Sequence, residues 1–405
     1  MENAFGPLPA TRIAALEHLQ RFVPKAGRDY ARLRNYDLGP GGHAHVSMLS
    51  PYLRHRLVTE EEVLRSVLAR HTAAGAEKFI QEVFWRSYWK GWLEMRPEVW
   101  ADYQAGLHAA INRTKSESGL RQCWSDACHG QTGLTAFDHW AQELMQTGYL
   151  HNHARLWFAS IWIFTLKLPW ELGADFFLRH LLDGDPASNT LGWRWVAGLQ
   201  TKGKTYLARP DNIAQFTERR FQPSGLATHA PALSGPDHPP RRPLPGPSTW
   251  PKDKRTGLLL HEDDLSPGFL FDAGLSPVSV AGLQTSAHRS PLAVSDLVQG
   301  FTRDALNDAA QRWQSRSGNN GGVHDTVTTL VTWARSNTLR QIVTPYAPTG
   351  PAAEGLNDLE EALHQHDITL IRPMRDYDSR AWPHATHGFF RFKEKIPQLL
   401  AAMGL

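Results

Sequence analysis

Two stretches decide the fold of the first half of this chain: ELMQTGYLHNHARLWFASIWIF at residues 143–164 and LLDGDPASNTLGWRWVAG at residues 181–198. The first stretch predicts a helix that begins near His151 and carries Arg155. The second holds a loop with two carboxylates and an amide among tryptophans: Asp183, Asp185 and Asn189. Such groups among indoles suit a planar, hydrogen-bonding redox ring, although buried Arg–Asp pairs are also ordinary structural contacts.

The residues around these stretches predict further helices throughout the first 220 positions. Thr59 followed by Glu62 forms a capping-box pattern, and Ser50 with Pro51 reads as an N-cap and first helical residue. Apolar residues cover more than one face of the segment 76–95, so we expect that helix to be buried on most sides.

Composition excludes several classes of protein. The 405 residues are 41% hydrophobic and 20% charged with a formal net charge of +3, which is typical of a soluble globular protein of about two domains. No apolar run is long enough for a bilayer span and no signal peptide is recognisable, so we expect a cytoplasmic protein without membrane contact. Only two cysteines are present, which excludes a disulfide scaffold. Eleven of the 15 tryptophans lie between Trp85 and Trp195.

The pattern changes after a proline-rich stretch. Nine prolines lie between residues 223 and 254, which predicts a linker or strap. Beyond it, short apolar runs alternate with helical patterns, which predicts a parallel sheet. We therefore expect a mostly α-helical domain at 1–222, a linker at 223–254 and a smaller α/β domain at 255–405.

Four strings together resemble the FAD-binding helical domain of the photolyase/cryptochrome family. They are the two stretches above, HVSMLSPYLRHRL at 45–57 and QEVFWRSYW at 81–89, and they stand in the family's order and at matching separations. The resemblance implies a helical cleft that holds a folded FAD molecule beside a cavity for a flipped-out DNA lesion. The family's α/β domain normally comes first, whereas here LLLHEDDLSPG (258–268) and HGFFRFKEKIP (387–397) resemble its segments, which implies a permuted order.

The resemblance also assigns residues. It implies that the diphosphate and adenine side of FAD is held by Tyr30, Ser47, Met48, Leu49 and Ser50. It places five residues on or beside the flavin ring: Arg86, Arg155, Asp183, Asp185 and Asn189. It assigns lesion binding to Glu82, Trp85, Asn152 and Trp195, and electron transfer to Trp193 and Trp170. No metal site is expected, because the His-x-His pairs lack a nearby third ligand.

The implied function is light-dependent repair of cyclobutane pyrimidine dimers in UV-damaged DNA, with electrons from reduced FAD. The alternatives are a blue-light photoreceptor that binds FAD without repair, and a relic that binds DNA without chemistry. Leu156 stands where dimer photolyases usually have Met, and the outer tryptophan of the family's electron-transfer chain has no counterpart before Trp124. Candidate phosphate-binding residues follow the helical region: Lys202, Lys204, Arg209, Arg219 and Arg220. The sequence identifies neither a second antenna pigment nor a protein partner.

Overall fold

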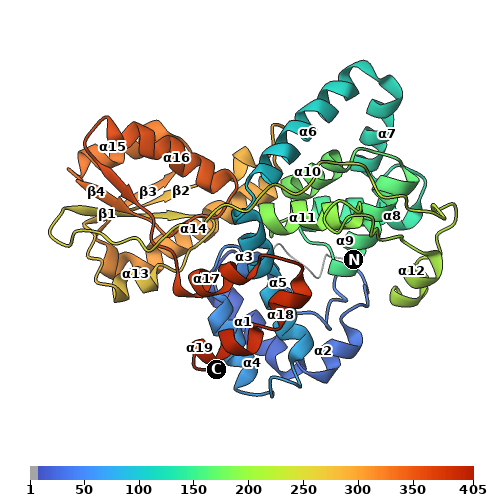
Figure 1. Ribbon diagram of the computed structural model, residues 1–405, viewed down its shortest axis with the longest axis horizontal. Coiled ribbons are helices and arrows are strands. Elements are labelled where there is room, and N and C mark those ends of the chain that lie inside the picture. Colours follow the sequence, from blue (N-terminus) through green and yellow to red (C-terminus); the bar gives the residue numbers. More distant parts are fainter. Residues whose placement is uncertain (1–7) are drawn as a thin grey trace.

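The computed structural model describes residues 8–405, and Figure 1 shows a helical part beside a smaller α/β part. Thr59 forms the expected capping box with Glu62 at the start of α4. Ser50 is not the N-cap of its helix, because α3 already includes it and Leu49 precedes it without a side-chain cap. The helices of this part are α1 (Arg12–Phe22), α2 (Arg28–Leu33), α3 (Ser50–Arg54), α4 (Glu60–Leu68), α5 (Glu77–Glu94), α6 (Glu98–Ser116), α7 (Ser118–His129), α8 (Thr135–Thr147), α9 (Asn152–Ser160), α10 (Trp170–His180), α11 (Pro186–Val196) and α12 (Pro210–Phe216).

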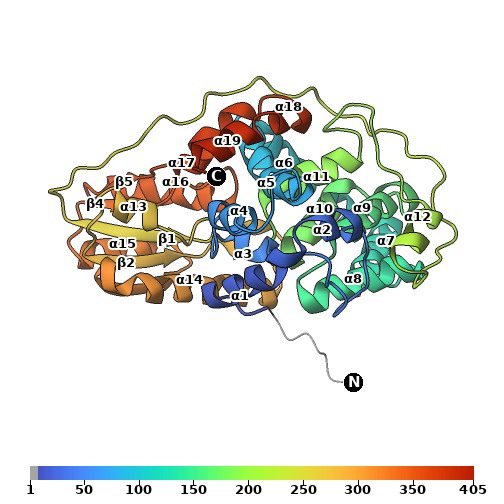
Figure 2. The same ribbon diagram turned by 90° about the horizontal axis from the view of Figure 1, so that it is seen from below.

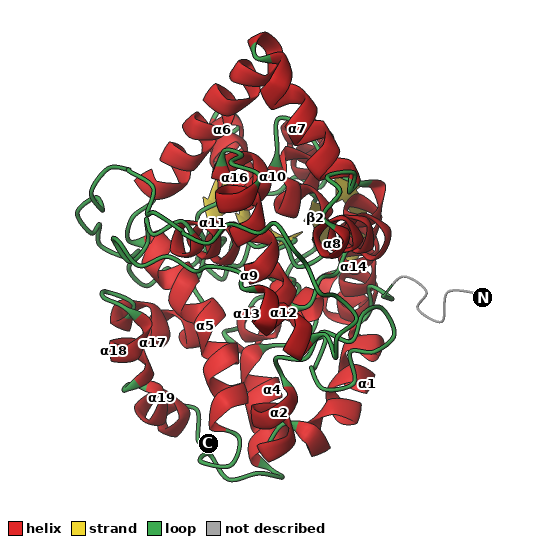
Figure 3. Cartoon of the chain, turned by 90° about the vertical axis from the view of Figure 1, so that its right-hand side faces the viewer, coloured by secondary structure: helices red, strands yellow, loops and turns green. Residues whose placement is uncertain are grey.

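The helices α6 and α7 form a hairpin that projects from the rest of the molecule (Figures 1 and 3). Helix α5 runs through the centre and is buried on most sides, as the spread of its apolar residues predicts. None of the helices between residues 8 and 405 is long and apolar enough to span a bilayer.

The second part is built on a five-stranded parallel sheet with the strand order β3-β2-β1-β4-β5. This confirms the predicted combination of a helical region and a smaller parallel α/β region. The strand β3 was not predicted, because its sequence NNGGVH is polar and rich in glycine. The elements are β1 (Thr256–His261), α13 (Gly268–Asp272), β2 (Ser279–Leu283), α14 (Asp296–Ser317), β3 (Asn319–His324), α15 (Val327–Ser336), β4 (Gln341–Val343), α16 (Pro351–His364) and β5 (Thr369–Ile371).

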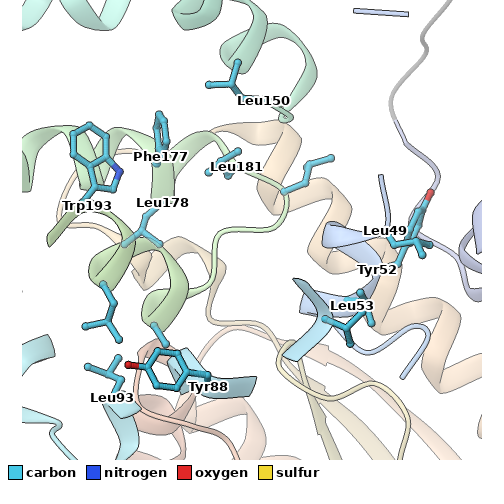
Figure 4. Packing of buried hydrophobic residues seen from close by; sticks show 14 of the residues in the cluster. Leu49, Tyr52, Leu53, Tyr88, Leu93, Leu150, Phe177, Leu178, Leu181 and Trp193 are labelled. Atoms are coloured by element: carbon cyan, nitrogen blue, oxygen red, sulfur yellow. The ribbon is translucent and has the colours of Figure 1, made fainter. Parts of the chain in front are cut away.

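The two faces of the sheet belong to different apolar clusters. Leu259 of β1 packs in a cluster with residues of α15 and α16, whereas Leu258 and Leu260 join the large core that runs through the helical part. Alternate residues of a strand point to opposite faces, so one strand serves both clusters. Figure 4 shows members of the large core from α3, α5, α10 and α11.

The strap and the chain end tie the two parts together. Residues 222–254 run extended over the molecule, as Figure 2 shows. After β5, the short helices α17 (Asp376–Ala381), α18 (Phe389–Lys393) and α19 (Ile396–Ala402) return to the helical part. Trp382 lies so close to α5 that a Cβ atom on Gly91 would be 2.8 Å from its Cα. The division at 222/223 and 254/255 stays a prediction.

A buried ionic network joins the two parts. The Arg56 guanidinium donates to Glu60 (3.1 Å), to Asp264 (3.0 Å) and to Asp378 (2.7 Å). Asp264 also accepts from Arg375 at 2.9 Å. All five side chains are at most 9% exposed. Each charge is therefore neutralised only by its partners and not by water.

Removing one member of this network should destabilise the whole chain. Asp264→Ala leaves Arg375 and part of Arg56 buried without a countercharge, which costs about 3–5 kcal/mol. Urea unfolding at neutral pH should show this loss as a lower midpoint. Asp29→Ala is the matched control, because it removes an exposed partner of Arg32. Equal midpoints for the two variants would contradict the role assigned to the network.

Candidate functional site

A cavity of about 580 Å³ lies between α2, α3, α5, α9, α10 and α11. This volume falls in the range of small-molecule and cofactor sites. Every predicted site residue except Trp170 lines it: Tyr30, Ser47, Met48, Leu49, Ser50, Glu82, Trp85, Arg86, Asn152, Arg155, Asp183, Asp185, Asn189, Trp193 and Trp195. The fold thus collects residues that are up to 165 positions apart around one space.

The inner wall carries the Arg155–Asp183 pair. Arg155 Nη2 donates to Asp183 Oδ2 at 3.0 Å, and Arg155 Nε donates to the Leu150 carbonyl at 2.9 Å. Burial alone would raise the pKa of Asp183, but the positive charges of Arg155 and Arg86 outweigh it and hold that pKa below its usual value. Asp183 is therefore a carboxylate at neutral pH.

Asp185 and Asn189 shape the start of α11. Asp185 caps the helix by accepting from the Ser188 backbone N–H at 3.0 Å. Burial alone would raise the pKa of Asp185, but the charges of Lys90, Arg86 and Arg54 outweigh burial and hold that pKa below its usual value. Asp185 is therefore also ionised at neutral pH. The Asn189 amide donates to the Ala174 carbonyl at 2.8 Å, which fixes its orientation and leaves its oxygen as an acceptor.

Three buried polar atoms on the cavity wall make no hydrogen bond within the protein: Asp183 Oδ1, Trp193 Nε1 and Arg86 Nη1, which lies 3.8 Å from Asp185 Oδ2. Buried polar groups in folded proteins are nearly always hydrogen-bonded. A guanidinium nitrogen, a carboxylate oxygen and an indole N–H that lack hydrogen bonds on one wall indicate that the cavity is built for a polar ligand.

The remaining lining residues include two aromatic platforms and an ion pair. The Trp85 ring stacks on Phe389 of α18 with 3.6 Å between ring centroids and an interplanar angle of 11°. The Trp195 ring stacks at 6.0 Å on Tyr206. Glu82 forms an ion pair with Arg34. Sequence reasoning missed Arg34 and Phe389, although Arg34 follows Tyr30 by one helical turn.

Trp170 lies elsewhere. It lines a second cavity of about 840 Å³ beneath the strap, and its ring is 5.7 Å from that of Tyr103. The ring of Trp193 packs on α10 at Gly173, three residues after Trp170. The contact is so close that a Cβ on Gly173 would be 2.3 Å from this ring. Trp193 also packs edge-on against Trp162 at 6.1 Å.

Three of the five predicted phosphate-binding cations have an acidic side chain beside them. Arg220 pairs with the buried Asp37 at 2.9 Å, and Lys202 forms an ion pair with Asp237. Arg209 lies 3.8 Å from Asp211. Within residues 8–405, no three His, Cys, Asp or Glu side chains are grouped so as to hold a metal ion.

Many of the residues that line this cavity lie in a segment that is similar to known proteins. Residues 79–233 match the family model of the FAD binding domain of DNA photolyase. A deoxyribodipyrimidine photo-lyase of Streptomyces griseus is 31% identical over 199 residues, which cover 46% of this chain and 42% of that protein. One from Thermus thermophilus is 31% identical over 250 residues, covering 59% and 54%. Residues 79–233 are thus similar to the FAD binding domain of DNA photolyase.

Among solved structures, a bacterial class III photolyase from Agrobacterium tumefaciens is 27% identical and covers 51% of this chain and 43% of its own, with a TM-score of 0.43. The chain spans about half the length of the curated photolyases that it matches.

The residues that line the cavity fit FAD. Arg86 supplies a cation beside Asp183 and Asp185, and the hydroxyls of Ser47 and Ser50 supply donors suited to a diphosphate. The ionised Asp185 is suited to accept a ring N–H, and the aromatic walls suit a flat ring system. The unpartnered Arg86 and Asp183 atoms are the kinds of group that such a ligand would satisfy.

Arg155→Ala should lose most of the flavin. The substitution leaves Asp183 buried without its main countercharge, which costs about 3–5 kcal/mol. It also leaves the Leu150 carbonyl without the hydrogen bond that Arg155 donates. The measurement is the ratio of flavin to protein absorbance after purification in the dark. Arg32→Ala, on the exposed face of α2, is the control and should keep full occupancy. Full flavin content in Arg155→Ala would contradict the assignment.

Proposed function

We propose that the protein is a deoxyribodipyrimidine photolyase that repairs cyclobutane pyrimidine dimers in UV-damaged DNA. The observation that carries this proposal is the meeting of the predicted FAD-binding and lesion-binding residues around one cavity. Bound FAD in its reduced form supplies, under blue light, the electron that splits the dimer.

The chain's own residues would bind and orient the lesion. Trp85 and Trp195 offer two indole faces on which a flipped-out pyrimidine pair can stack, and stacking contributes about 1–3 kcal/mol per base. Glu82 and Asn152 border the same space and would hydrogen-bond the pyrimidine edges. The indole of Trp193 lies in the cavity wall and would carry electrons to the flavin from the protein side.

A second candidate is a blue-light photoreceptor that binds FAD without repair. Two of the proposed lesion-binding groups already have protein partners, since Trp85 stacks on Phe389 and Glu82 pairs with Arg34. Repair requires the free face of Trp85 and a rearranged Glu82, whereas signalling requires neither.

Loss of thymine dimers from an oligonucleotide under blue light, with reduced protein, decides between the two functions. Repair predicts that the wild type removes dimers in the light. The dissociation constant for the dimer oligonucleotide, measured in the dark, should rise at least tenfold in Trp195→Ala and in Glu82→Ala, because each variant loses a stacking or hydrogen-bonding partner of the lesion. Asp102→Ala, exposed on α6, should behave like the wild type. If the protein holds reduced flavin yet repairs no dimer in single or double strands, the photoreceptor replaces the enzyme.

A further inference from the structure

His153 lines the cavity, but neither FAD binding nor lesion binding as described above uses it. It lies in the first turn of α9, directly after Asn152. Its ring is held on two sides: Nδ1 lies 3.0 Å from the Asn35 carbonyl oxygen, and one face stacks on Trp157 with 4.1 Å between ring centroids. A carbonyl oxygen can only accept, so in the neutral ring Nδ1 carries the proton and Nε2 is left as an acceptor.

The acceptor Nε2 faces Tyr206, which follows α11. The Tyr206 hydroxyl lies 3.4 Å from His153 Nε2 and donates to it, because Nε2 has no proton. On its other side Tyr206 contacts Trp195, and the two rings stack with 6.0 Å between centroids and an interplanar angle of 30°. The Tyr206 backbone N–H also donates to the carbonyl of Val196, the residue after Trp195, at 3.2 Å. One side chain therefore connects His153 with an indole of the proposed lesion site.

Protonation of His153 would break this connection. Burial has the largest influence on the pKa of His153 and lowers it below its usual value. The backbone hydrogen bond and the charge of Asp37 oppose burial without outweighing it, and the charge of Arg34 lowers the pKa further. The ring is therefore neutral at pH 7, whereas in acid Nε2 gains a proton and can no longer accept from Tyr206. The neighbouring His151, whose pKa burial lowers to about 3, stays neutral at about pH 5 and above.

We propose that His153 is a positioning residue for the lesion site: through the Tyr206 hydroxyl it holds the Trp195 indole at the tilt at which a flipped-out base stacks. This inference rests on the proposed repair function. A base gains contact with an indole only when the two rings lie against each other, so a Trp195 ring that is free to turn binds the lesion less tightly. His153 acts through Trp195 and not on the lesion itself, so its contribution requires that indole.

Two substitutions separate the two nitrogens of the ring. His153→Gln places an amide oxygen near the position of Nε2 and keeps the acceptor, whereas His153→Asn keeps a donor near the position of Nδ1 and loses the acceptor. The measurement is the dissociation constant of a single-stranded thymine-dimer oligonucleotide for the flavin-loaded protein in the dark at pH 7.5. His153→Asn should weaken binding at least threefold, and Tyr206→Phe equally, whereas His153→Gln should stay within twofold of the wild type. The effect is modest because the hydrogen bond is long.

A double substitution tests whether the effect passes through the indole. Added to Trp195→Ala, the change His153→Asn should cause no further loss of binding, because the ring that it positions is already absent.

The pH profile of the same dissociation constant is a readout that a purely structural role would not move. Between pH 7.5 and pH 5 the wild type should lose affinity as His153 gains its proton. His153→Gln should lose at least threefold less over this range, because its side chain does not titrate. His108→Gln, which removes an exposed histidine of α6, is the matched control and should keep the wild-type profile.

The outcomes separate the positioning role from the function on which it rests. If the wild type does not bind the dimer at any pH, the repair function fails and the positioning role fails with it. If the wild type binds and His153→Asn binds equally well, or weakens binding as much beside Trp195→Ala as alone, the positioning role alone is overturned. It is likewise overturned if His153→Gln keeps the wild-type pH profile, or if His153→Asn loses its flavin while Tyr206→Phe binds the dimer like the wild type.

Discussion

The interaction on which the structure depends is the pairing of the acidic loop after β1 with arginines of the helical part. Glu262, Asp263 and Asp264 stand at the carboxyl end of β1, where the sheet order turns from β2 to β4. In open parallel sheets this crevice is the usual ligand-binding position. Here Arg54 pairs with Asp263, and Arg56 pairs with Asp264. The helical part thus occupies the crevice that such a sheet normally offers to a ligand.

This pairing reaches the candidate FAD cavity in one further step. Arg54 Nε donates to the Gly184 carbonyl at 3.0 Å, between the two cavity carboxylates Asp183 and Asp185. Burial raises the pKa of Asp263, but Arg54, His261 and Lys90 lower it to about 2, so the pair stays charged at neutral pH. A fully charged, fully buried contact has few alternative arrangements. We infer that the α/β part, through Asp263 and Arg54, holds in place the loop that carries Asp183 and Asp185.

Local patterns predicted the elements better than the contacts between them. The capping box at Thr59 and the alternation of strands and helices after residue 255 are short-range signals, and the structure contains both. The sequence NNGGVH of β3 lacks the alternation of apolar residues by which a strand can be predicted. This segment is a strand because its backbone pairs with β2. Arg54 and Asp263 are 209 positions apart, and no periodicity relates residues at that distance. The resemblance to a family assigned the cavity residues but gave Phe389 no role at the site, because that residue lies near the chain end, 304 positions after Trp85.

The chain end connects the α/β part with the wall of the cavity. Arg375 and Asp378 are members of the buried network, Trp382 then packs against Gly91 of α5, and Phe389 stacks on Trp85. One short segment therefore runs from the acidic loop of the sheet to an indole of the cavity. Because both ends of the segment are held, the face of Trp85 that Phe389 covers is closed to a ligand. The segment after the α/β part thus supplies a side chain, Phe389, that packs on the wall of the site.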